Sequence, residues 1–127
     1  MPKFRDDYFS DNPAIASVPA GRLDDILDGA FDLVFMDIEG SEYFAFLGMP
    51  RLLAHAKTLI VEFLPHHLSR VAGITVDDFL APLTPHFDQL TIPTTRLVVD
   101  RKDFKSVLQD MCERDQSDPA IVFCRRA

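Results

Sequence analysis

The chain has 127 residues, enough for one domain, and its hydrophobic fraction of 47% is too high for a disordered protein. No apolar run reaches the roughly 18 residues of a membrane span, no signal peptide is evident, and the net charge of −7 argues against a nucleic acid partner. Cys112 and Cys124 lack metal-ligand spacing and are expected as reduced thiols, so we expect a cytoplasmic protein without a membrane partner.

The first half of the chain predicts a helix and strand after a polar start. Residues 1–21 are polar and are expected as an N-terminal segment, with the folded part over residues 22–127. A short helix is predicted over residues 22–27. Residues 31–37 are mostly apolar without alternation, which is typical of a strand buried on both faces. Ser41 can begin a helix, and Pro50 a second one that ends near Ala56.

The second half continues this alternation. The apolar and β-branched run over residues 58–64 predicts a second buried strand, adjacent and parallel to the first. Further elements are a helix over 75–83, strands over 87–92 and 96–100, a helix over 103–113 and a strand over 120–124. The pattern predicts an α/β fold with a mainly parallel sheet and flanking helices.

Acidic residues follow the first strand directly. Asp37, Glu39 and Glu42 lie where that strand leaves the sheet, and open α/β sheets bind ligands at the carboxyl ends of their strands. Glu62 lies near the end of the second strand. We therefore expect Asp37, Glu39 and Glu62 to converge on one rim, with His66 close by. The alternatives are that Glu42 only complements a helix dipole, that Asp37 and Glu39 are solvated, and that the His66-His67 pair occupies an exposed loop.

These residue types allow acid–base chemistry. Crowded carboxylates raise one another's pKa, which makes one of them a better base, and histidine titrates near neutrality. Carboxylates could instead hold a divalent cation, and a small metal hydrolase using Asp37, Glu39 and His66 is a further alternative. The spacing of Glu62 and the two histidines is not a familiar metal motif, so no metal ligand is assigned.

Three short motifs in this order resemble the FkbM-type methyltransferases: Leu23-Asp24-Asp25, then Asp37-Ile38-Glu39-Gly40-Ser41-Glu42, then Val61-Glu62. The resemblance implies a Rossmann-like methyltransferase fold and S-adenosylmethionine-dependent transfer, mostly to oxygen, of a methyl group to a small-molecule acceptor. It implies catalytic roles for Asp37, Glu39, Glu62 and His66, cofactor contacts for Asp37 and Ile38, and acceptor contacts for Glu42 and His67.

The resemblance also implies that the cofactor loop is missing. Only 22 residues precede Leu23, and the sequence contains no G-x-G. We therefore expect a partial Rossmann-like fold, the C-terminal half of a methyltransferase domain, in which the strand over residues 31–37 forms an exposed apolar edge. Such an edge predicts a homodimer or a partner chain. The alternative function is a non-catalytic methyltransferase-fold remnant or interaction module.

Overall fold

The computed structural model describes residues 14–126, so most of the predicted polar segment over residues 1–21 lies outside the described part, and residues 14–22 form no helix or strand. None of the described helices is long and apolar enough to cross a membrane. The elements are α2 (Leu23–Ile26), β1 (Leu33–Met36), α3 (Glu42–Leu47), α4 (Pro50–His55), β2 (Thr58–Phe63), the π-helix η1 (His67–Ala72), α5 (Val76–Leu80), β3 (Gln89–Ile92), the 3₁₀ turns η2 (Pro93–Thr95) and η3 (Arg101–Asp103), β4 (Leu97–Asp100), α6 (Phe104–Glu113) and β5 (Asp118–Cys124).

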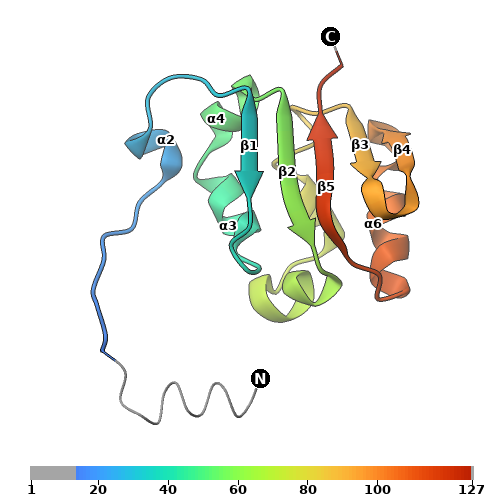
Figure 1. The fold of residues 1–127 in the computed structure, drawn as a ribbon, viewed down its shortest axis with the longest axis horizontal. Coiled ribbons are helices and arrows are strands. Elements are labelled where there is room, and N and C mark those ends of the chain that lie inside the picture. The colour runs from blue at the N-terminus through green and yellow to red at the C-terminus, as the bar shows by residue number, and fades with distance from the viewer. Residues whose placement is uncertain (1–13, 127) are drawn as a thin grey trace.

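The five strands form one mixed sheet in the order β1-β2-β5-β3-β4 (Figure 1). The predicted parallel pairing of β1 with β2 is confirmed, with Met36 opposite Val61. The prediction of a mainly parallel sheet was wrong, because the other three neighbouring pairs are antiparallel. The last strand, β5, runs between β2 and β3 in the opposite direction. In addition, β3 and β4 form a hairpin whose turn places Arg96 at a φ of 57°.

The core lies on one face of the sheet. Aromatic side chains of the helices pack edge-on against those of the strands on this face, as Phe104 does on Phe123 and Phe79 on Phe63. The opposite face is open at β1, where Leu33 is 56% exposed and Phe35 66% exposed. The expected burial of this strand on both faces was therefore wrong, because the described helices that supply the core cover a single face. In β2 the burial alternates instead of being continuous.

Asp24, in the acidic motif before β1, joins α2 to the start of α4. The carboxylate of Asp24 accepts hydrogen bonds from the backbone N–H groups of Arg51, at 2.6 Å, and Leu52, at 3.1 Å. These N–H groups lie at the start of α4 and have no partner within the helix, so Asp24 caps α4 from 27 residues away. The guanidinium of Arg51 donates back to the carbonyl of Gly29 at 2.7 Å. The motif thus holds the segment that leads into β1.

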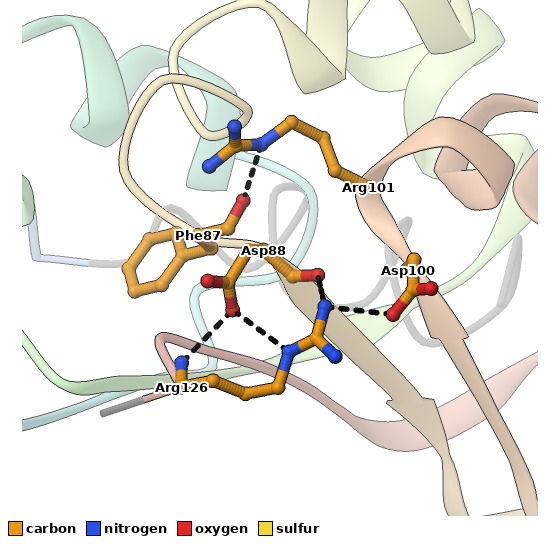
Figure 2. Close-up of polar contacts among 5 residues, drawn as sticks. All are labelled: Phe87, Asp88, Asp100, Arg101 and Arg126. Atoms are coloured by element: carbon orange, nitrogen blue, oxygen red, sulfur yellow. Dashed lines mark hydrogen bonds and ion pairs between the residues drawn. The ribbon is translucent and has the colours of Figure 1, made fainter.

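A second set of charged contacts joins β3, β4 and the end of β5 at the end of the sheet where β1 and β2 begin (Figure 2). The guanidinium of Arg126 donates to Asp100 at 2.7 Å, and its backbone N–H donates to the carboxylate of Asp88 at 2.9 Å. The Nε atom of Arg101 donates to the carbonyl of Phe87 at 2.9 Å. These contacts connect the residue before β3, the last residue of β4 and the segment after β5. They fix the end of the sheet that lies away from the carboxyl ends of β1 and β2.

Candidate active site

The carboxyl ends of β1 and β2 meet at one rim, where η1 also begins (Figure 1). Ligand atoms of Glu39, Glu62 and His67 all lie within 4.8 Å of one another. Glu39 comes from the loop after β1, Glu62 from the end of β2, and His67 from the first turn of η1. The expected convergence of Glu39 and Glu62 is therefore confirmed, and the histidine that joins them is His67 and not His66.

The loop after β1 holds an unusual backbone conformation. Glu39 has a φ of 56° and Gly40 a φ of 97°, which is a conformation that favours glycine. A Cβ atom at Gly40 would lie 2.8 Å from Cγ1 of Val71 and 3.2 Å from Cγ of His67. Only glycine allows this close approach between the loop and η1. The approach brings Glu39 beside His67.

Glu42 stabilises the same loop from within. Its side chain is buried, and its Oε1 atom accepts a hydrogen bond from the backbone N–H of Ile38 at 3.2 Å. This contact ties the first turn of α3 to the residue that follows Asp37. The side chain of Ile38 is 43% exposed, and Asp37 is exposed beside it. The predicted acceptor contact of Glu42 stays a prediction, while its contact with Ile38 is structural.

Glu62 carries a carboxyl group with a raised pKa at the rim. It lies where the pairing of β2 with β5 is interrupted by a bulge between Val61 and Phe63. Its Oε1 atom is buried and has no hydrogen-bond partner among the described residues. Burial raises the pKa of Glu62 above its ordinary value, and the negative charges of Asp37 and Glu39 raise the pKa further, against a smaller opposing effect of His67. Because Met36 lies opposite Val61 in the parallel pair, the next residues, Asp37 and Glu62, lie at the same rim, as predicted.

The two histidines border different hollows. His67 is only 9% exposed and lines a small cavity of about 10 Å³ together with Glu62, Glu42 and Gly40. His66 is exposed and lines a separate groove of about 360 Å³ that also includes Arg70, Thr75, Gln109 and Asp115. The imidazole rings meet edge to face, with their centroids 4.6 Å apart. The reading of both histidines as an exposed loop was therefore wrong for His67.

The π-helix was missed by the sequence reasoning. Leu68 is buried, and Gly73 ends the element at a φ of 68°, the left-handed conformation common after helices. The sequence does carry one indication of a helical turn here. Two apolar residues, Leu68 and Val71, lie three residues apart and are followed by Gly73. Helical π-turns are rare and frequently occur at functional sites. This turn places His67 beside Glu62.

The rim can therefore bind a cation or accept a proton. It brings two carboxylates and one imidazole together and leaves Asp37 exposed next to them. None of the ion pairs within residues 14–126 includes Asp37, Glu39, Glu42 or Glu62. Within this described part of the chain, the negative charge at the rim is thus not balanced by an ion pair with lysine or arginine. The catalytic and cofactor roles of Asp37, Ile38, Glu39, Glu62 and His66 stay predictions.

Comparison with known proteins gives one match. A model of the methyltransferase FkbM domain matches residues 3–115. This range contains the Asp24 motif, the loop after β1, Glu62 and both histidines. No curated protein and no solved structure matches the chain.

Proposed function

This chain belongs to the FkbM methyltransferase family, and on that basis we propose that it takes part in S-adenosylmethionine-dependent methyl transfer to the oxygen of a small-molecule acceptor. The observation that carries the proposal is the convergence of Glu39, Glu62 and His67 at the carboxyl ends of two parallel strands. Ligands of open α/β sheets bind at such a rim.

Glu62 is the proposed proton acceptor. Its raised pKa brings the carboxylate closer to the basicity that deprotonation of a hydroxyl requires. Glu62 would take the hydroxyl proton as the acceptor oxygen forms its bond to the methyl group that bound S-adenosylmethionine would supply. Glu39 and His67 orient the acceptor beside Glu62, and this positioning is a large part of such catalysis. His66, which lines the adjoining groove, contributes to this acid–base chemistry from there.

The residues of this chain fit one side of the cofactor. S-Adenosylmethionine supplies an activated methyl group when bound. The exposed carboxylate of Asp37 suits its positive charge, and the exposed side chain of Ile38 suits an apolar part of it. The backbone N–H of Ile38 is already bonded to Glu42, so it does not donate to the cofactor. We propose that the rest of the cofactor is held by a glycine-rich segment outside this sequence, because this sequence has no G-x-G.

That segment has a natural place beside β1. This strand has one neighbour, β2, among the described strands, and no described strand pairs with its other edge. An apolar groove of about 220 Å³, lined by Leu27, Leu33, Phe35 and Met49 among others, lies next to it. We propose that the sheet is the C-terminal half of a Rossmann-like methyltransferase domain, and that a second chain with the glycine-rich half pairs with β1.

Association at this edge can be measured directly. We expect light scattering to show self-association of the chain alone through β1, and the variant Phe35→Lys to be monomeric, because a charge at the open edge opposes strand pairing. The variant Val98→Lys, on the far edge strand β4, is the control, since Val98 is also exposed. A wild-type chain that stays monomeric at high concentration, with its β1 amides protected from hydrogen exchange, would show that this edge is already covered and would contradict the proposal.

Cofactor binding tests the proposed function. We expect titration of the ¹⁵N-labelled chain with S-adenosylmethionine to shift amide resonances within residues 36–42 and 61–67, and Asp37→Asn to weaken the binding. The control is Asp77→Asn, an exposed aspartate on α5. A folded chain whose spectrum does not change at millimolar cofactor would favour the second candidate, a non-catalytic interaction module, for which the absence of G-x-G speaks.

The free thiols bear on location. Cys112 and Cys124 are both unpaired by disulfides in the described chain, which fits a reducing compartment. We propose a cytoplasmic location on this basis.

A further inference from the structure

We propose that Glu39, Glu62 and His67 form a binding site for one divalent first-row transition-metal cation. Their ligand atoms lie within 4.8 Å of one another. Ligands of a common ion, each at about 2.1 Å from it, are separated by roughly 3 to 4.2 Å. Small side-chain rotations therefore suffice to close the three groups around one ion.

An unpartnered polar atom inside the cluster supports the site independently of which residue types form it. The Oε1 atom of Glu62 is buried and has no hydrogen-bond partner among the described residues. His67, whose ligand atom lies within 4.8 Å of those of Glu39 and Glu62, is itself only 9% exposed. Buried polar groups in folded proteins are nearly always bonded, so the unpartnered oxygen of Glu62 beside a buried imidazole indicates a missing ligand.

The backbone around the cluster is arranged to hold it. Gly40 allows the loop after β1 to contact η1, and Glu39 adopts the uncommon positive φ of 56° next to it. The three ligands come from three separate elements, so the cation would join the ends of β1 and β2 to η1. The backbone of a site that requires such precision is expected to be constrained in this way.

Charge favours a cation at this position. Asp37, Glu39, Glu42 and Glu62 gather at the rim, and none of the ion pairs in the described chain compensates them. Two carboxylates and one imidazole suit Mn²⁺, Fe²⁺ or Zn²⁺ better than Mg²⁺ or Ca²⁺, which prefer oxygen ligands only. Three protein ligands leave coordination positions open, as in catalytic metal sites.

One consequence rests on the proposed function. A cation bound to Glu62 occupies the carboxylate that would otherwise take the acceptor proton. Such a cation would supply Lewis-acid polarisation of the acceptor oxygen in place of the Glu62 carboxylate. Binding of the cation itself requires neither cofactor nor acceptor, so its failure is separate from failure of methyl transfer.

Calorimetric titration of the metal-free chain with MnCl₂ and ZnCl₂ tests the site. We expect one cation per chain, with the affinity reduced at least about tenfold in Glu39→Gln and in Glu62→Gln. Glu39 is exposed, so its substitution leaves folding intact and keeps the test valid if Glu62→Gln fails to fold. The matched control combines Glu113→Gln with His55→Gln, two exposed residues on α6 and α4, and should bind as the wild type does.

Electron paramagnetic resonance on the Mn²⁺ complex identifies the ligand type. We expect a nitrogen coupling from the His67 imidazole, which is lost in His67→Gln and kept in His66→Gln. Two results would overturn the proposal: no binding of either ion at millimolar concentration to the folded wild-type chain, or binding that Glu39→Gln and Glu62→Gln leave unchanged.

Discussion

At one end of the sheet, Asp88 and Asp100 share the charged side chain of Arg126 (Figure 2), while at the other end Glu39 and Glu62 face His67 without an arginine or lysine. The two ends have opposite effects on their carboxyl groups. The backbone N–H and the guanidinium of Arg126 lower the pKa of Asp88 below its ordinary value. Burial, Asp37 and Glu39 raise the pKa of Glu62 above its own.

This difference separates acids that stabilise the fold from the acids of the candidate site. A carboxylate with hydrogen bonds and a guanidinium partner stabilises the fold when it is ionised. A carboxylate that is buried without a partner destabilises the fold when it is ionised, and such a group persists where a ligand uses it. The end of the sheet around Arg126, Asp88 and Asp100, here called the paired end, joins β3, β4 and β5. The end around Glu39, Glu62 and His67, here called the unpaired end, carries the residues that resemble a methyltransferase site.

The largest expected effect comes from Gly40, which shapes the unpaired end. Replacing it with alanine adds a Cβ atom 2.8 Å from Val71 at a φ of 97°. Strain and overlap together should lower the free energy of unfolding by about 2–5 kcal/mol, measured by urea denaturation.

Gly29→Ala is the matched control for that variant. Gly29 also has a positive φ, of 86°, but a Cβ atom there meets nothing within 4 Å. Its replacement should cost only about 1 kcal/mol of backbone strain. Equal losses in the two variants would show that the contact between the loop and η1 is not what Gly40 protects.

The sequence predicted the candidate site at the rim because the apolar runs mark the strands and the acids after them mark where those strands end. Apolar runs ending in acids located β1, and Pro65 located the end of β2, so the parallel pair and the meeting of Glu39 with Glu62 followed. Helices α3 and α4 followed from Ser41 and Pro50 in the same way. These features depend on residues that are close together in the chain, so they can be read from the sequence alone.

The parts that the sequence did not predict depend on distant contacts. Strand β5 is apolar in either direction, so its antiparallel insertion between β2 and β3 left no local trace. The exposure of Leu33 and Phe35 depends on where helices lie, and an apolar strand looks the same whether covered on one face or two. His67 joined the site through a π-turn, which few sequence patterns indicate.

Neutralising the unpaired end should stabilise the chain. We expect Glu62→Gln in the metal-free protein to raise the free energy of unfolding near neutral pH by at most on the order of 1 kcal/mol, because it removes the charge of a half-buried carboxylate whose Oε1 atom has no partner. The folded pKa of Glu62 lies above its ordinary value of 4.5. Wild-type stability should therefore decline as the pH rises from that value through the raised pKa, and the variant should lack this decline.

Denaturation curves across this pH range measure the effect, with Glu113→Gln, an exposed glutamate, as the control. A Glu62→Gln variant that is less stable than the wild type near neutral pH would mean that the carboxylate has a partner in solution. In that case the contrast between the two ends of the sheet would not hold.

The smallest effect, and one of opposite sign, is expected at the paired end. Asp88 has a lowered pKa, so its stabilising contribution is complete above its ordinary value of 3.8 and is lost as the pH falls through the lowered pKa. Asp88→Asn should remove that acid-dependent part and slightly reduce stability near neutral pH, because exposed ion pairs contribute little. Asp110→Asn is the control, since the exposed Asp110 on α6 pairs with Arg114, the residue that follows this helix. If Asp88→Asn kept the acid dependence of the wild type, then the contacts of Arg126 would not be what stabilises this end, and its carboxylates would resemble those of the candidate site.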